Sequence, residues 1–313
     1  MAGFVLQRLG AAAATLWLAT VLVFGAMLLV PGDPAQAILG LEASPEALQA
    51  LRRELGLDRP PPVRYAEWFG RVVRGDLGRS IRYGQPVAQL VGARLAVTLP
   101  LVFSSLALAA AIGTVLGTLA ARRAGTRLDL AVSGFALAGA VLPSFWVGLV
   151  FVFAFSVELR LLPSGGFPGW ADWRSAAAHL VLPVATLALT RAALFTRMVR
   201  ASLLEVLHQD YVRTARAKGL AEPAVLLRHA LRNAAIPVVT VLGLEFAQLL
   251  TAGLVVESVF ALPGLGTLAL TAIEARDYPL VQGIVLVLAA FIVALNLATD
   301  VAYARLDPRI AYG

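Results

Sequence analysis

The sequence predicts an all-α protein that crosses a membrane several times. Only 14% of its 313 residues are charged, 59% are hydrophobic, and the mean hydropathy is +0.80. An ordinary soluble domain is about 25% charged. Four stretches of 22 to 28 residues hold no charge, and about 20 apolar residues suffice for a helix to cross the hydrocarbon core.

Six spans are predicted, two of them interrupted by one charge each. Residues 180–195 contain Arg191, and residues 236–256 contain Glu245. Each of the other four spans is limited by the charged residues that flank its uncharged stretch. The predicted segments are a cytoplasmic N-terminus 1–8, spans 9–30, 95–121, 130–157, 179–196, 236–257 and 280–303, an extracytoplasmic insert 31–94, cytoplasmic segments 122–129 and 197–235, extracytoplasmic loops 158–178 and 258–279, and a cytoplasmic C-terminus 304–313.

The first apolar stretch has two interpretations. Ala35-Gln36-Ala37 has the small-x-small pattern of a signal-peptide cleavage site. The apolar run from Leu9 to Val30 is longer than the usual core of about 7–15 residues in a signal peptide. We therefore interpret it as a retained membrane span.

Composition excludes several chemistries. The chain has no cysteine, which excludes disulfide frameworks, zinc–thiolate sites and thiol catalysis. Its net charge of +7 is typical of arginine-rich cytoplasmic loops in a membrane protein, so we expect no nucleic-acid partner.

The distribution of positive charge predicts the orientation. Long loops do not count in the positive-inside rule, so the 31–94 insert is set aside. The side that holds the N-terminus then carries thirteen arginines and lysines, and the short loops opposite carry three. Both termini and the 197–235 segment are predicted to be cytoplasmic.

The 31–94 insert is predicted to contain two short helices. Ser44-Pro45-Glu46 has the pattern of an N-cap, a first-turn proline and a first-turn acid, and Gly56 can end that helix. "DRPPPVRY" predicts a stiff extended turn, and "YAEWFGRVVRGDLG" predicts a second amphipathic helix. The insert is small for an independent domain and should pack on the membrane face.

The segment "DYVRTARAKGLAEPAVLLRHALRNAAIP" (210–237) is polar, basic and helix-prone, and a hydrophobic span follows it. Tyr211, Ala215 and Leu220 indicate an apolar stripe, Gly219 a left-handed C-cap, and Pro223 the first turn of a second helix. This helix–glycine–helix elbow suits docking into a groove of another protein. The alternative is an interfacial amphipathic helix held by anionic lipid.

No motif for hydrolysis is found. A P-loop requires Gly-Lys-Ser/Thr, and the only lysine, Lys218, stands between Ala217 and Gly219. The histidines at 179, 208 and 229 form no metal or nucleophile motif, so we expect no catalytic residues and no metal. Energy for transport must come from a partner or from an ion gradient.

Ionisable residues in or near spans are costly in lipid and often functional. Arg191, Glu245 and Asp300 support an alternative function as an ion-coupled secondary transporter or channel. A structural explanation is that Arg191 and Glu245 pair between helices. Polar groups at membrane depth in the third and fifth spans usually face the protein interior. The candidate path residues are Ser144, Phe145, Trp146, Glu245 and Gln248.

Two further features concern helix packing. Gly113-x-x-x-Gly117 permits close approach of a neighbouring helix. Pro143 lies inside the third predicted span and predicts a kink there.

The 210–237 segment resembles the cytoplasmic coupling motif of binding-protein-dependent ABC importer permeases: Glu-Ala-Ala, three residues, Gly, nine residues, Ile-x-Leu-Pro. Aligned on Gly219, the chain keeps Ala215 and Leu231 and departs at Arg213, His229 and Arg232. "YVRTARAKGL" followed by "LLRHALRNAAIP" is similar to the variant in the dipeptide/oligopeptide/nickel branch. Similar stretches elsewhere are "PGDPA", "GDLGRSIRYGQPV", "LPSFWVGL", "LLPSGG" and "VESVFALPGLGTLALTAIEARDYPLVQG".

The resemblance implies a type I importer permease of the B-subunit type in the inner membrane, with no cofactor of its own. It would pair with a second permease, two ATPase subunits that bind ATP and Mg²⁺, and an extracytoplasmic solute-binding protein. Cargo would be short peptides, glutathione-like molecules or nickel complexes. In that family the helix around the motif glycine docks into the ATPase. The residues assigned to this coupling are Tyr211, Arg213, Ala215, Lys218, Gly219, Leu220, Arg228, His229 and Leu231.

Overall fold

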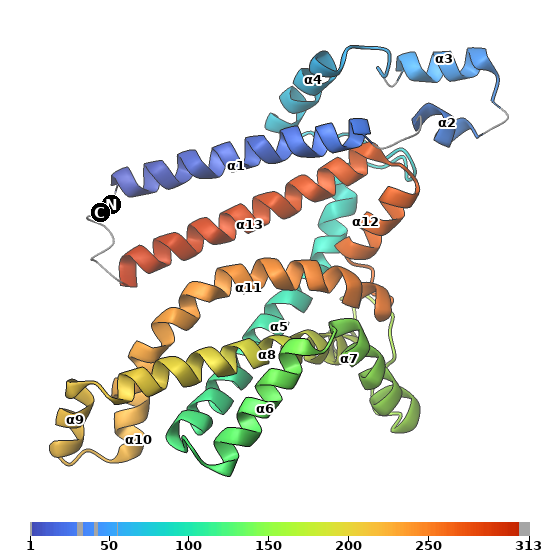
Figure 1. Ribbon diagram of the computed structural model, residues 1–313. Coiled ribbons are helices and arrows are strands. Elements are labelled where there is room, and N and C mark those ends of the chain that lie inside the picture. Colours follow the sequence, from blue (N-terminus) through green and yellow to red (C-terminus); the bar gives the residue numbers. More distant parts are fainter. Residues whose placement is uncertain (1, 30–33, 41–42, 55, 307–313) are drawn as a thin grey trace. The chain divides into compact units, whose positions relative to one another are not determined.

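The computed structural model describes residues 2–29, 34–40, 43–54 and 56–306, and every regular element in them is helical (Figure 1). The chain forms two compact units. The first comprises residues 1–97 and 264–313, and the second comprises residues 98–263. A long helix, α5 (Val87–Arg122), contributes its first residues to one unit and the remainder to the other.

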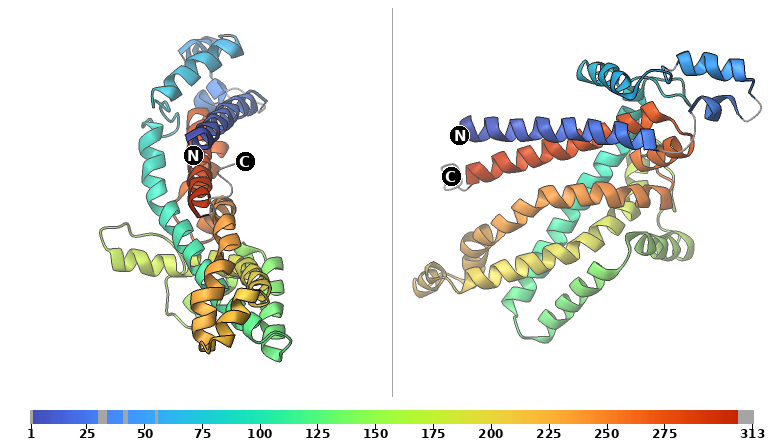
Figure 2. Two further views of the ribbon diagram at one scale, coloured as in Figure 1. Left: turned by 90° about the vertical axis from the view of Figure 1, so that its left-hand side faces the viewer. Right: turned by 45° about the horizontal axis from the view of Figure 1, so that its top comes forward.

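The first unit is built on an antiparallel pair of long helices. α1 (Ala2–Leu29) and α13 (Tyr278–Leu306) lie side by side in both orientations of Figure 2, and they are in contact. The first turn of α1 and the last turn of α13 therefore lie at the same end of the pair.

Three short helices follow α1: α2 (Pro34–Leu39), α3 (Pro45–Glu54) and α4 (Pro61–Val73). The predicted cap of α3 is confirmed, because Ser44 Oγ accepts a hydrogen bond from the Ala47 amide. The extended turn predicted for "DRPPPVRY" is only half right. Pro61 and Pro62 form the first turn of α4, where a fixed φ and a missing N–H are tolerated.

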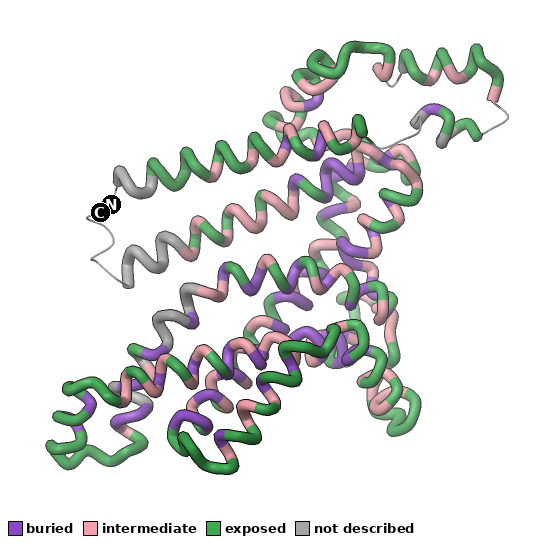
Figure 3. Tube along the Cα trace, viewed as in Figure 1, coloured by how far each residue is buried: buried purple, intermediate pink, exposed green. Residues whose placement is uncertain are grey.

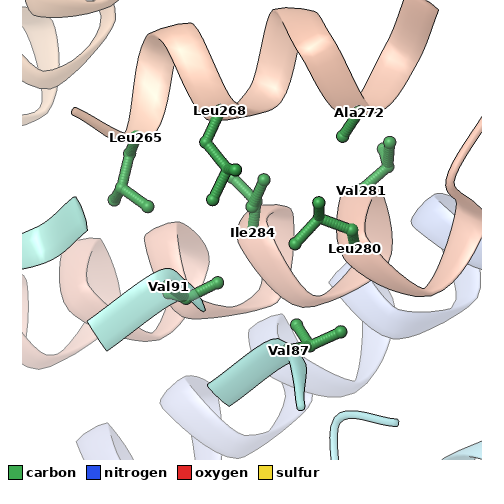
Figure 4. Close-up of a cluster of buried hydrophobic side chains, with 8 residues drawn as sticks. All are labelled: Val87, Val91, Leu265, Leu268, Ala272, Leu280, Val281 and Ile284. Atoms are coloured by element: carbon green, nitrogen blue, oxygen red, sulfur yellow. The ribbon is translucent and has the colours of Figure 1, made fainter. Parts of the chain in front are cut away.

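The loop predicted over 258–279 contains a further helix, α12 (Leu265–Glu274). Its buried residues pack with the start of α5 and the first turns of α13 in a single apolar cluster (Figure 4). Asp277 then caps α13. The fully buried Asp277 carboxylate accepts hydrogen bonds from Ser80 Oγ, from the Arg82 amide at 3.0 Å and from the Leu280 amide at 3.2 Å.

The second unit is a bundle around α8 (Trp173–Leu207). α11 (Leu231–Val259) and α6 (Arg127–Val141) both pack on α8. The predicted close approach at Gly113 and Gly117 is confirmed. A Cβ at Gly113 would overlap Phe195, and one at Gly117 would lie 2.7 Å from Val199 Cβ.

The third span is broken rather than kinked. α6 ends at Val141, and α7 (Ser144–Phe151) with the π-helical η1 (Val152–Glu158) leaves at an angle of 106°. The prediction of a kink within a continuous span 130–157 is therefore wrong in degree. Leu142 has ψ 127° because the residue before a proline is pushed out of the α region, so the helix ends there.

Among the described residues, five helices are long and apolar enough to cross a membrane, or six if the broken pair counts as one span. Several begin or end outside the predicted bounds. α5 begins at Val87 rather than 95, and α8 begins at Trp173 rather than 179. The predicted bounds were set by charged residues, which end a membrane span but can lie within a helix that continues beyond the membrane. The N-cap Asp172, which accepts from the Arg174 and Ser175 amides, is the sequence signal that sets the start of α8.

Candidate coupling elbow and intramembrane polar residues

The elbow connects α8 to α11 through three short helical elements. α9 (Asp210–Ala217) ends in a left-handed glycine, Gly219, with φ +78°. The Gly219 amide donates to Arg216 O at 2.9 Å, and the Leu220 amide donates to Ala215 O at 3.4 Å. This pair of bonds is a Schellman motif. The predicted C-cap is confirmed, as is Pro223 in the first turn of α10 (Glu222–Ala224).

The apolar face of the elbow differs from the predicted stripe. Val212 and Ala215 are buried against Val225, the first residue of the π-helical η2 (Val225–Ala230). Tyr211 and Leu220, by contrast, are 42% and 43% exposed. Val212 occupies the buried position because it lies three residues before Ala215, on the same helix face.

Two polar contacts hold the elbow in shape. The Arg216 guanidinium donates twice to Glu222, Nη2 to Oε1 at 2.7 Å and Nε to Oε2 at 3.1 Å. These hydrogen bonds lower the pKa of Glu222 and raise that of Arg216. Asn233 Nδ2 donates to the Tyr211 hydroxyl at 2.8 Å and so joins α9 to α11. Sequence reasoning missed both contacts, because spacings of 6 and 22 residues are not helical repeats.

The predicted coupling residues divide into three groups. Tyr211, Arg213, Lys218, Gly219 and Leu220 are exposed. Figure 3 shows the elbow largely in the colour of exposed residues. Ala215 is buried within the elbow, and Leu231 packs partly against the cluster around Phe195. The side chains of Arg228 and His229 lie outside the described part of the chain.

The two charges inside predicted spans contact each other. Arg191 Nη1 on α8 lies 3.3 Å from Glu245 Oε2 on α11. The structural explanation given for these residues therefore holds. The side chain of Asp300 is not described. Of the predicted path residues, Glu245 is buried in this pair, whereas Phe145, Trp146 and Gln248 are exposed and Ser144 is half-buried.

Two further buried polar pairs were not predicted. Arg200 near the end of α8 binds Asp129 at the start of α6 with two bonds, Nε–Oδ1 2.6 Å and Nη2–Oδ2 2.8 Å. Thr98 Oγ1 donates to Glu257 Oε1 at 2.6 Å, and both side chains are fully buried. Asp129 and Glu257 lie at the edges of predicted spans. A charged residue at the edge of a span is expected to be exposed, so the sequence did not indicate that these two are buried.

The apolar helices and the capped elbow define a polytopic helical membrane protein with a folded polar elbow between the spans α8 and α11. The chain belongs to the binding-protein-dependent transport system inner membrane component family, whose pattern matches residues 113–312. A second family pattern, which describes the N-terminal part of binding-protein-dependent transport system membrane components, matches residues 1–102.

Full-length relatives carry related names. A putative peptide transport system permease protein of Brucella suis biovar 1 is 42% identical, and the match covers 100% of both chains. The glutathione transport system permease GsiC of Escherichia coli O6:H1 is 40% identical over 100% of both chains. An inward-facing methionine ABC transporter, MetNI, includes a chain of the same fold. Its TM-score is 0.59 at 19% identity, over 70% of this chain and 97% of that one.

Proposed function

We propose that this permease moves short peptides, or a related small solute, through an ATP-driven importer. The full-length relatives named for peptide and glutathione transport support this cargo class. The chain would form the path together with a second permease, two ATPase subunits would bind ATP and Mg²⁺, and a solute-binding protein would deliver cargo from outside. No comparison supports the ion-coupled alternative, and the Arg191–Glu245 contact accounts for two of the three charged residues that motivated it.

In the proposed orientation, both termini and the elbow lie in the cytoplasm. The short segments assigned to that side carry thirteen positive charges and the short loops opposite carry three, which supports this orientation. The antiparallel pairing of α1 with α13 brings the start of one and the end of the other to the same side, as a common side for both termini requires.

The observation that carries the coupling role is the constrained elbow with its exposed apolar residues. The Schellman turn and the Arg216–Glu222 pair fix the backbone, while Tyr211 and Leu220 stay exposed beside Lys218. A preorganised apolar surface with a basic rim loses little entropy when it docks into a groove. ATPase closure would move this elbow and, through α8 and α11, the spans.

The test uses the absence of native cysteine. Leu220→Cys should form a disulfide with a cysteine placed in the groove of the co-purified ATPase, detected as a shifted band on a non-reducing gel. Leu161→Cys, 69% exposed in the loop predicted to lie outside, is the matched control and should form none. Equal cross-linking from both positions, or none from Leu220→Cys in an assembled complex, would contradict the coupling role.

A further inference from the structure

A polar cavity lies in the first unit at the end of the α1–α13 pair opposite the chain termini. It encloses about 300 Å³ between the outer turns of these helices, α4 and the 76–81 loop. Three arginines line it, Arg64, Arg71 and Arg79, together with Glu67 and Asp76.

The free charge in this cavity is positive. Glu67 is paired with Arg59 at 2.5 Å. Asp76 Oδ1 accepts from the neutral Gly78 amide at 2.8 Å and keeps its charge, so the three guanidinium groups outnumber this one carboxylate. Among the described residues, Arg64 and Arg71 form no ion pair, and Arg79 bonds only to the Gly84 carbonyl, at 2.6 Å. Guanidinium groups without a carboxylate partner are suited to binding a phosphate.

One neutral polar group in the same cavity also lacks a partner. The buried Tyr278 hydroxyl has no hydrogen-bond partner within the described part of the chain. Buried polar groups are nearly always hydrogen-bonded, so this hydroxyl indicates a ligand. Gln282 on α13, which is only 7% exposed, lines the same cavity.

An apolar groove of about 350 Å³ adjoins the cavity at Leu77, which lines both. The groove follows α1 from Thr20 to Ala13, about 10 Å along the helix. Its only polar side chain, Thr20, already bonds to Trp17 O and the Tyr65 hydroxyl at 2.6 and 2.8 Å. The opposite wall is formed by Leu286, Val287 and Ala290 of α13.

We propose that the cavity and groove together bind one anionic glycerophospholipid of the surrounding bilayer. Its phosphate contacts Arg64 and Arg71, its headgroup and ester oxygens reach Tyr278 and Gln282, and the upper part of one acyl chain occupies the groove. A soluble anion would leave the groove empty, whereas a lipid fits both halves. The groove is shorter than one leaflet of a hydrocarbon core about 30 Å thick. Assignment to the outer leaflet follows from the proposed orientation, but the binding itself does not depend on it.

Native mass spectrometry of the intact complex, titrated with phosphatidylglycerol, tests the headgroup half. The double variant R64Q/R71Q should lower phosphatidylglycerol affinity by about tenfold, because two charge-assisted contacts are lost. The control R53Q/R74Q removes the same charge from α3 and from the C-cap of α4, at positions that do not line the cavity. Equal loss in both variants would indicate general attraction to the insert and would overturn the proposal.

A second pair of variants tests the groove. Ala290→Phe should fill the groove and reduce phosphatidylglycerol retention, whereas Ala294→Phe, one turn further along the exposed side of α13, should not. A photo-reactive residue at Ala290 should cross-link lipid. Cross-linking to another protein subunit, or unchanged lipid retention in both A290F and R64Q/R71Q, would overturn the site.

Discussion

Arg216 and Glu222 form a two-point ion pair on either side of Gly219, with N–O distances of 2.7 and 3.1 Å. The pair links the end of α9 to the start of α10. Because the left-handed turn at Gly219 sets the path of the chain and the ion pair sets the angle between the two helices, the elbow has one preferred shape. The positions of Tyr211 and Leu220, the residues proposed to dock, depend on that shape.

Glu222→Gln should loosen the elbow without unfolding the chain. Both partners are about 40–45% exposed, so the expected loss of stability is small, about 0.5 kcal/mol or less. Hydrogen exchange of residues 210–225 should quicken while α8 and α11 stay protected. If the rest of the bundle exchanges equally fast, the ion pair has a wider structural role than proposed.

The same pair predicts a pH dependence. The pKa of Glu222 lies below its ordinary value of 4.5 in the folded elbow, chiefly because Arg216 donates hydrogen bonds to it. A lowered folded pKa gives stability that is present above the unfolded value and is lost as pH falls through the folded value. The difference in hydrogen exchange between wild type and E222Q should therefore be full at pH 7, begin to shrink as the pH falls below 4.5, and be lost once the pH has fallen through the lower folded pKa of Glu222. A difference that persists at low pH would contradict this account.

Gly219→Val should uncouple ATP hydrolysis from transport. Open space surrounds the position, so the cost comes from the backbone at φ +78° rather than from a clash. An L-residue there costs about 1 kcal/mol, and a β-branched one costs more. In proteoliposomes, ATP hydrolysis should continue while uptake falls about tenfold or more. Gly169→Val, at φ +92° in a different loop, is the matched control, and full uptake in G219V would contradict the coupling role.

The elbow shows what the sequence can and cannot predict. Gly219 and Pro223 were located correctly because each acts through its own backbone, and that effect is local. Val212 was missed and Tyr211 was assigned to the wrong face, because burial on α9 depends on which of its faces packs against η2. Arg200 with Asp129 and Ser80 with Asp277 are 71 and 197 residues apart, so their pairing depends on tertiary packing and leaves no periodic signal.

Asp129→Asn should destabilise the second unit. The bidentate pair with Arg200 joins the start of α6 to α8, and the Gly125 amide also donates to the Asp129 carboxylate, at 3.0 Å. Removing one partner of a buried pair costs about 3–5 kcal/mol. Because Arg200 is about one-third exposed, solvent screens this pair and the loss of stability should be smaller than that. Thermal unfolding in detergent measures the loss, and the charge swap D129R/R200D should restore part of it. No recovery in the swap would indicate that Gly125 rather than Arg200 is the important partner.

Glu245→Gln should leave ATP-driven uptake largely intact. In the 3.3 Å contact with Arg191, this carboxylate joins α8 to α11, and a glutamine can still accept a hydrogen bond there. Uptake by reconstituted complexes, measured with and without a proton gradient, tests this expectation. Abolished uptake in a normally assembled complex would place Glu245 in the translocation path.

Gly113→Val should prevent α5 from packing on α8. A Cβ at this position would overlap Phe195 Cβ and lie 2.9 Å from the Thr196 amide nitrogen. Backbone cannot move aside as the end of a flexible side chain can, so the helices must separate, at a cost of about 1–3 kcal/mol or more. Gly134→Val on α6 is the control, because no atom lies within 4 Å of a Cβ there. Thermal unfolding should show a lowered transition for G113V and little change for G134V. If the unfolding transition is lowered equally in both variants, the cause is the replacement of a helical glycine by valine and not the loss of the α5–α8 contact.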